Sequence, residues 1–272
     1  MQHASVNDTP LTGAERQQCI KFLRNHIIEV FNDPYVVPYY HRPVKVYRDR
    51  ETGLPYVLTD ENRRLYFRRG TKARIVRRCY NALCREQDTL SPHNYAFHPL
   101  SIHSDSVLVD VGAAEGIFTL KFIDSIKKAC LFECDEGWIE ALQATFRPWK
   151  EKIVIVNKFV SDRDDGEFVS LDHFFRRGEK PTLIKIDAEG AESEVLKGAD
   201  KILEEGATDL LVCTYHRHGD ERKLSEQLRQ KRYQTIPSQG YMLFLWEKPN
   251  FALEEPFDSR RGLVYASRSL RG

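Results

Sequence analysis

Apolar runs of strand length alternate with segments of helical periodicity from residue 105 onward. The strand-like runs lie at 106–111, 128–133, 153–160, 182–187, 209–215, 233–237 and 241–247. Helix-like segments separate the first six of these runs, for example at 117–127, 138–147, 191–204 and 220–231. Such alternation is typical of a parallel sheet that carries helices on both faces.

The last two predicted strands are joined only by residues 237–240, "PSQG". This connection is too short for a right-handed crossover, so we expect the last two strands to form an antiparallel hairpin. Six parallel strands with one terminal antiparallel hairpin are typical of a class I methyltransferase, whereas a dehydrogenase-type sheet would be fully parallel. The predicted fold is therefore α/β, with a seven-stranded Rossmann-like sheet and a terminal antiparallel hairpin.

Residues 1–100 have a different and less regular pattern. The spacing of Thr12 and Glu15 is that of a capping box, and apolar residues then recur at helical intervals, which predicts a helix over 12–31. Three prolines interrupt residues 32–43, and residues 44–67 alternate between strand and turn patterns. We therefore predict an N-terminal α+β cap at 1–100 and a second domain at 101–272.

Composition narrows the classes of protein that fit. The chain has 272 residues, of which 41% are hydrophobic and 30% charged, and its net charge is +1. It contains no apolar run of the roughly 18 residues that a membrane span needs, and residues 1–17 contain no apolar signal core. We predict a cytoplasmic protein with reduced thiols, because no C-x-x-C pair occurs among the cysteines: Cys19, Cys79, Cys84, Cys130, Cys134 and Cys213.

The segment 42–78 is strongly basic, with twelve Lys or Arg against four Asp or Glu. It is either a solvated face or a surface for an anionic substrate such as a phosphorylated sugar or a nucleic acid. Few aromatic residues interleave with its arginines, and the net charge of the chain is near zero. Both facts weigh against a nucleic-acid partner.

The turn after the first strand of the second domain has the pattern Asp110-x-Gly112-x-x-x-Gly116. It lacks the dinucleotide fingerprint, because Ala114 stands at the second glycine position of that motif. Glu115 would repel a phosphate at the helix N-terminus. An acidic turn of this kind suits a ligand with an amino acid end, such as S-adenosylmethionine, whose ammonium Asp110 could help to hold. A purely structural turn is the alternative.

Two further strand ends carry acids. Glu133 ends the second strand, 23 residues after Asp110, where a carboxylate is placed to accept both ribose hydroxyls of an adenosine ligand. Ser161 and Asp162 follow the third strand, where Asp162 could bond the adenine amino group or form an ordinary Asx turn. The turn and Glu133 together predict a ligand that contains adenosine.

The fourth strand contains two charged residues, Lys185 and Asp187, on one face. A strand covered on both faces is normally apolar, so these charges form either a structural ion pair or part of a site. Asp187, Glu189 and Glu192 have a spacing that could bind one hard cation, but they also lie at a helix N-terminus that stabilises acids by itself. We predict no metal here.

Several stretches resemble the FkbM family of S-adenosylmethionine-dependent methyltransferases. They are "DVGAAEGIFTL", "LFECDEGWIEAL", "SLDHFF", "LIKIDAEGAESEVLKGA", "LLVCTYHR" and "RGLVYAS", and the resemblance spans about residues 85–267. It implies methyl transfer, commonly to oxygen, on a sugar, polysaccharide or other secondary metabolite. It also implies a cofactor site made of Asp110, Gly112, Ala113, Gly116, Glu133, Ser161 and Asp162.

Catalysis should lie at the ends of strands four and five. A hydroxyl gains from a general base, and His216 has the pKa range for that role near pH 7. A structural hydrogen-bonding role for His216 is the alternative. Asp187 could orient His216 or bind a substrate hydroxyl, and the remaining substrate-side candidates are Glu189, Lys185 and His93. We expect Tyr215 to point into the helix layer and His218 to face solvent.

Two other classes of function stay open beside a small-molecule or glycan methyltransferase. An RNA or DNA methyltransferase would use the basic 42–78 segment as a platform, although the chain lacks the N/D-P-P-Y/F motif of base amino-group methylation. A non-catalytic module would bind the cofactor or a partner without turnover. The oligomeric state is open, and a dimer is one possibility.

Overall fold

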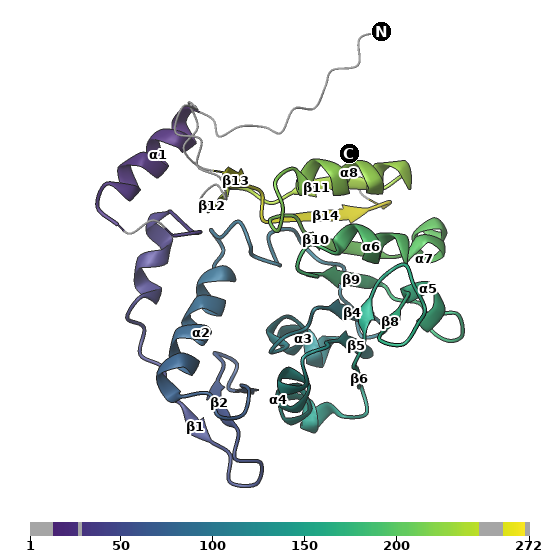
Figure 1. Cartoon of the computed structure of the whole chain (residues 1–272), viewed down its shortest axis with the longest axis horizontal. Coiled ribbons are helices and arrows are strands. Elements are labelled where there is room, and N and C mark those ends of the chain that lie inside the picture. Colours follow the sequence, from purple (N-terminus) through teal and green to yellow (C-terminus); the bar gives the residue numbers. More distant parts are fainter. Residues whose placement is uncertain (1–12, 27–28, 245–257, 270–272) are drawn as a thin grey trace.

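The computed structural model describes residues 13–26, 29–244 and 258–269. Its central sheet has seven strands in the order β11-β14-β10-β9-β4-β5-β6 (Figure 1). Their bounds are Gln234–Pro237, Leu263–Ser267, Asp209–Cys213, Leu183–Ile186, Val107–Val111, Lys128–Phe132 and Ile153–Val156, in that order. β14 runs antiparallel to both of its neighbours, and the others run parallel to one another. The predicted α/β fold of a class I methyltransferase is confirmed.

The seventh strand of the sheet is not the one predicted. The apolar run at 241–247 contributes only β12 (Met242–Phe244), which pairs with β13 (Asp258–Arg260) in a separate two-stranded sheet, and residues 245–247 lie outside the described residues. The antiparallel partner of β11 is β14 instead. All five residues of β14 are buried, as a strand between two others requires, whereas Met242 packs on Phe22 and Phe31 of the N-terminal segment.

Helices cover both faces of the sheet. Successive side chains along a strand point to opposite faces of the sheet, so alternate residues of each strand lie in two separate hydrophobic cores. One core packs under α3 (Ile117–Phe122) and α4 (Glu136–Phe146), and the other under helices α5 to α8. The bounds of the latter are Leu171–Phe174, Glu192–Lys197, Asp200–Glu205 and Asp220–Gln230. Short 3-10 helices, η2 (Ile123–Ser125) and η3 (Arg147–Trp149), extend α3 and α4.

The N-terminal segment packs on the α3 and α4 side of the sheet (Figure 1). It contains α1 (Gly13–Leu23), the 3-10 helix η1 (Pro34–Tyr39), three antiparallel strands and α2 (Ala73–Glu86). The strands are β1 (Tyr47–Arg48), β2 (Pro55–Leu58) and β3 (Arg64–Tyr66), as the strand and turn patterns predicted. Val57 and Val76 share one core with Leu108 of β4. The N-terminal segment and the sheet thus share a core, and the division of the chain into two domains at about residue 100 stays a prediction.

The first predicted helix is too long. It was expected over 12–31 but ends at Leu23, because Phe31 turns back to pack with Phe22. A continuous helix would hold these two side chains about 13 Å apart along its axis. Thr12 and the side chain of Glu15, the predicted capping box, lie outside the described residues.

The sequence patterns missed α2 altogether. The segment was interpreted as a basic stretch because of its four arginines, although Val76, Tyr80 and Leu83 form an apolar face at helical spacing.

The five cysteines that the structure describes are free thiols: Cys79, Cys84, Cys130, Cys134 and Cys213. Within the described residues, no helix combines the length and the apolar composition that a membrane crossing needs.

Candidate active site

The sheet reverses its direction of growth between β4 and β9. From β4 the chain proceeds outward through β5 and β6, and it then returns to place β9 on the other side of β4. In open α/β sheets the carboxyl ends of the strands at such a switch point form the ligand crevice. The turn at Gly112 follows β4 and Asp187 follows β9, so the structure brings both predicted features to this point.

The glycine turn is fixed by close backbone and helix contacts. Gly112 has φ +69°, and a Cβ there would lie 1.9 Å from the backbone oxygen of Asp187. Gly116 has φ +80° at the start of α3, and its Cβ would lie 2.7 Å from side-chain atoms of Leu142 and of Phe146. Any other residue would push β9 or α4 away. The predicted site residue Ala113 is buried, and its N–H and that of Gly112 donate to Phe132 O.

Asp110 and Lys185 form a buried ion pair beneath this turn. They are register partners on β4 and β9, and Lys185 Nζ lies 3.0 Å from Asp110 Oδ1. Thr119 Oγ1 donates to Asp110 Oδ2 at 2.8 Å, and Lys185 Nζ donates to the carbonyl of Gly112 at 2.7 Å. The Asp110 carboxylate is thus fully buried and already bonded. Its predicted contact with the cofactor stays a prediction.

Glu133 joins the ends of β4 and β5. Its Oε2 accepts the N–H of Ala114 at 2.8 Å, and its Oε1 accepts those of Cys134 and Asp135, both at 2.8 Å. A carboxylate has about four acceptor positions, so one remains on Oε2 in this arrangement. The bond to Ala114 also holds that residue at φ +45°, which is unusual for a residue with a side chain. Glu133 therefore lies where a ribose was predicted, against the glycine turn.

Asp187 lies at the end of β9 and accepts two tyrosine hydroxyls. Tyr95 donates to Oδ2 at 2.9 Å and Tyr215 to Oδ1 at 3.2 Å. Burial alone would raise the pKa of Asp187, but the nearby Lys185, together with histidines, holds it below its usual value. The expectation that Tyr215 points into the helix layer is wrong. The two-residue repeat of β10 carries it to the same face as Cys213, the face on which Asp187 lies.

His216 lies between three carboxylates. Its Nδ1 is 2.9 Å from Glu192 Oε1, and its Nε2 is 3.4 Å from Asp187 Oδ1 and 3.5 Å from Glu189 Oε2. Glu192 is 1% exposed and is held by the N–H groups of Ala188 and Gly190. Burial alone would lower the pKa of His216, but these carboxylates raise it above its usual value. The geometry is that of an imidazole oriented by a fixed acid.

The two other predicted substrate-side residues differ in environment. His93 is buried beside Tyr95 and Tyr215, and burial lowers its pKa to about 4, so its ring is neutral at pH 7. Glu189 has φ +52° and a side chain that is 92% exposed. His218 is exposed, as expected, and its Nδ1 lies 2.8 Å from Asp258 Oδ1.

Two carboxyl groups near the turn, the buried Glu115 and the half-buried Glu86, were not predicted as site residues. Burial raises the pKa of Glu115 to about 7. Burial and the neighbouring Glu115 raise the pKa of Glu86, at the end of α2, to about 8. Only the helical spacing within α2 could have directed attention to Glu86, and its approach to the turn depends on how the cap folds.

Ser161 and Asp162 lie apart from the site residues around the Gly112 turn and Asp187. β6 ends at Val156 rather than at 160, and the chain then forms β7 (Phe159–Val160), which pairs with β8 (Phe168–Val169). The backbone of Ser161 packs on Gly198 between α6 and α7, where a Cβ on that glycine would meet Ser161 O at 2.0 Å. Asp162 is exposed. Their role in binding adenine stays a prediction.

Among the residues that the structure describes, two groups of donor atoms could hold a metal ion. In each, the ligand atoms lie within 4.8 Å of one another, and Asp187 belongs to both. One group adds Glu192 and His216, and the other adds His93 and Cys213. The carboxylates already accept tyrosine or backbone donors, so an ion would compete with those bonds.

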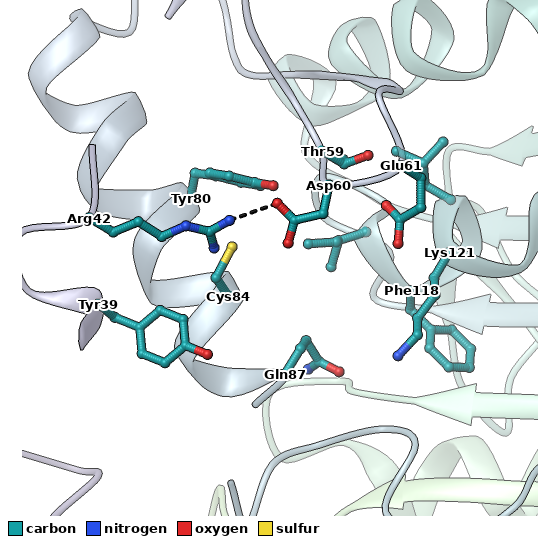
Figure 2. Close-up of a pocket in the computed structure, with 12 residues that line it drawn as sticks. Tyr39, Arg42, Thr59, Asp60, Glu61, Tyr80, Cys84, Gln87, Phe118 and Lys121 are labelled. Carbon is teal, nitrogen blue, oxygen red and sulfur yellow. Dashed lines mark hydrogen bonds and ion pairs between the residues drawn. The ribbon is translucent and has the colours of Figure 1, made fainter. Parts of the chain in front are cut away.

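A cavity of about 220 Å³ lies between the cap and α3 (Figure 2). Tyr39 and Arg42 of the cap line one part of it, and Phe118 and Lys121 of α3 line another. Gln87 at its edge bonds the backbone at 93–95, which carries His93 and Tyr95. The cavity thus adjoins the segment that presents Tyr95 to Asp187.

Comparisons with known proteins agree with the predicted family. A family described as the methyltransferase FkbM domain matches residues 156–243, which confirms the resemblance over these residues. No curated protein matches the chain.

Solved structures with similar folds are remote in sequence. An FkbM methyltransferase from Methylobacillus flagellatus is 19% identical over 72% of this chain and 55% of its own length, with a TM-score of 0.47. A precorrin-6y C5,15-methyltransferase from Geobacter metallireducens is 12% identical over 65% of this chain and 90% of its own, with a TM-score of 0.46. An rRNA methylase from Streptococcus thermophilus is 16% identical over 61% and 88%, with a TM-score of 0.39. The chain therefore spans little more than half of the FkbM protein.

Proposed function

Because residues 156–243 carry a methyltransferase FkbM domain, we propose that this protein transfers a methyl group from S-adenosylmethionine to a hydroxyl oxygen. The acceptor class is a sugar, a polysaccharide or a secondary metabolite. The observation that carries the proposal is the arrangement at the switch point between β4 and β9. There the glycine turn and an oriented histidine meet across Asp187.

The residues around the turn fit this cofactor. S-adenosylmethionine has a cationic sulfur and an ammonium group, and the carboxyl groups of Glu115 and Glu86 have pKa values that burial raises more than the nearby Lys185 and Arg85 lower them. Glu133 keeps one acceptor position for a ribose hydroxyl beside the turn. The remaining proposed cofactor residues are Asp110, Gly112, Ala113, Gly116, Ser161 and Asp162.

In the proposed reaction His216 acts as the general base. When bound, S-adenosylmethionine supplies a methyl group that an oxygen nucleophile can attack in line with the leaving sulfur. Nε2 of His216 would take the proton of the acceptor hydroxyl, and Glu192 beside Nδ1 would stabilise the imidazolium that forms. Asp187 would bind the hydroxyl or orient the ring. Only neutral His216 can act, so methyl transfer should increase as the pH rises through its raised pKa.

The three proposed substrate-side residues would act at different distances from the acceptor. Glu189 is exposed next to His216 and could bind an acceptor hydroxyl directly. Lys185 is held by Asp110 and would act through the field that keeps Asp187 ionised. Neutral His93 would support Tyr95 and Tyr215 by ring contacts.

Calorimetric titration of the purified protein with S-adenosylmethionine, S-adenosylhomocysteine, NAD and ATP tests the proposal. We expect the first two to bind and the Glu133→Ala variant to bind them about 10- to 100-fold more weakly, which corresponds to about 1.5–3 kcal/mol for hydrogen bonds to a charged group. Glu136→Ala, an exposed acid on the next helix, is the matched control and should bind normally. Binding of NAD or ATP instead, or equal affinity in Glu133→Ala, would contradict the proposal.

A further inference from the structure

A groove of about 980 Å³ runs along α2, and its lining includes five arginines and a single acid among the described residues. Its cationic lining residues are Arg42, Arg74, Arg77, Arg78 and Arg85. Its acidic lining residue is Glu29, whose Oε2 is 2.6 Å from Arg85 Nη1. The chain as a whole has a net charge of only +1, so this groove is a local concentration of positive charge.

Three of the arginines are available to a ligand. Arg74, Arg77 and Arg78 are exposed, and no carboxylate of residues 13–26, 29–244 or 258–269 lies within 4.0 Å of their charged nitrogens, a distance that Arg42 and Arg85 do reach to acids. Arg77 Nε donates to the backbone carbonyl of Val44 at 3.1 Å, so this arginine would bind a ligand through its other guanidinium N–H groups. Arg74 and Arg78 are four residues apart on one helix and therefore lie on one side of it. Guanidinium groups match the oxygens of a phosphate in a two-pronged geometry.

The position of these cations is unfavourable for the isolated helix. They lie in the first two turns of α2, where the helix dipole disfavours positive charge, and no acid lies in the first turn. No side chain caps this N-terminus, because Lys72 stands at the N-cap. A bound anion would pair with the guanidinium groups and accept the free N–H groups of the helix end. Anion binding would therefore explain why arginines occupy positions that are unfavourable for the stability of the helix.

Aromatic rings lie in the same groove. Tyr39, Tyr40 and His41 line it, although in sequence they precede the basic stretch, which itself has few aromatics. Folding thus combines the arginines with rings that can stack on nucleobases. Sulfated or carboxylated glycans would use the charges but would gain little from the rings.

The groove shares lining residues with the cavity between the cap and α3. Tyr39 and Arg42 line both, and the cavity extends from them to Phe118 of α3 (Figure 2). The ring of Phe118 contacts Tyr95, whose hydroxyl bonds Asp187. An extended polyanion along α2 could therefore place one of its sugars at the cavity, from which Phe118 and Tyr95 lead to Asp187.

We propose that the groove along α2 binds single-stranded RNA through Arg74, Arg77 and Arg78 and presents a ribose hydroxyl of that strand as the methyl acceptor, which narrows the proposed sugar acceptor to a sugar within a polynucleotide. The second half of this statement rests on the proposed function, because it takes the site at Asp187 and His216 to be a methyltransferase site. The first half, RNA binding by the groove, stands by itself.

Fluorescence anisotropy of a labelled 20-nucleotide single-stranded RNA of mixed sequence, without cofactor, tests the groove. We expect the wild type to bind and Arg74→Glu/Arg78→Glu to bind at least about tenfold more weakly, with a salt dependence whose slope falls by about 1.4 for two lost phosphate contacts. Arg176→Glu/Arg177→Glu is the matched control, because these two exposed arginines lie after α5, and it should stay within about twofold of wild type. Circular dichroism melting of both variants confirms that each is folded.

Three results would overturn the inference. They are the absence of RNA binding by the wild type, equal losses in the two double variants, and a heparin fragment or tripolyphosphate that competes as well as unlabelled RNA at equal phosphate or sulfate concentration. The last would assign the groove to an acidic glycan or a small phosphate ligand. Titration of Arg74→Glu/Arg78→Glu with S-adenosylmethionine separates this outcome from failure of the proposed function. Intact cofactor binding with lost RNA binding supports the groove. Wild-type RNA binding without cofactor binding contradicts the methyltransferase proposal and with it the ribose acceptor, but it leaves RNA binding by the groove supported.

Discussion

Two pairs of ionisable side chains near the Gly112 turn, all buried except the half-buried Glu86, differ in how their charge is balanced. Lys185 and Asp110 neutralise each other at 3.0 Å, and Thr119 with a backbone carbonyl completes their bonds. Glu115 and Glu86 have the same sign, and among the residues that the structure describes neither has a Lys, Arg or His nitrogen within 4.0 Å. The first pair is complete without a ligand, and the second is not.

The difference indicates which pair serves structure and which serves binding. Burial would lower the pKa of Lys185, but the carboxylates of Asp110 and Asp187 raise it above its usual value, which favours the charged form of the lysine. Glu115 and Glu86 have pKa values of about 7 and 8 because their charged forms are poorly solvated. A cation bound at the turn would stabilise those charged forms, so we infer that the second pair completes its environment with a ligand.

The largest expected effect comes from breaking the balanced pair. Lys185→Met leaves the Asp110 carboxylate buried without its cation, and we expect the free energy of unfolding to fall by about 3–5 kcal/mol. Urea unfolding at pH 7 measures this loss. Lys185→Met/Asp110→Asn removes the stranded charge and should recover part of the stability. A loss below about 1 kcal/mol in the single variant would show that the pair is not the structural element described here.

The sequence could predict those features of the fold and the site that depend on local spacing along the chain. Strand and helix periodicity is a local property, and it located six of the seven sheet strands and the charged residues at their ends, including Asp187 and His216. The choice between 241–247 and 263–267 as the seventh strand depends on which run is buried between β10 and β11. Both runs are apolar, so pattern alone could not decide.

The residues that the cap contributes to the site could not be predicted from the sequence. Tyr95 and Glu86 reach the switch point because residues 73–98 fold across α3, and these contacts span many residues of sequence. No local signal marks such pairs. Conversely, the spacing of Asp110 and Lys185 could be read as either a structural pair or a site, and only the register of β4 with β9 shows that they meet.

The unbalanced pair should make stability fall as the pH rises. Glu115 has a pKa of about 7 when folded and an ordinary value of 4.5, so the folded protein binds more protons between these values and loses stability as the pH rises through them. Glu115→Gln cannot ionise, and we expect wild type to lose about 2 kcal/mol more than this variant between pH 5 and pH 8. Urea unfolding at pH 5, 6, 7 and 8 gives the two slopes. Glu136→Gln, at an exposed position, should follow wild type, and equal slopes for Glu115→Gln and wild type would contradict the assignment.

The smallest expected effect is the sharpest test of what the unbalanced pair binds, given the proposed cofactor. S-adenosylmethionine and S-adenosylhomocysteine share the ammonium group, but only the former has a cationic sulfur. Ionisation of Glu115 and Glu86 should therefore favour S-adenosylmethionine, and we expect the ratio of the two affinities to rise about tenfold, or about 1.4 kcal/mol, between pH 6 and pH 8.5. Calorimetry at both pH values measures the ratio, and Glu115→Gln should flatten its change. A ratio that stays constant in wild type would place the sulfonium away from this pair. The raised pKa values would then reflect burial under the cap alone, and both pairs would belong to the structure rather than to the cofactor site.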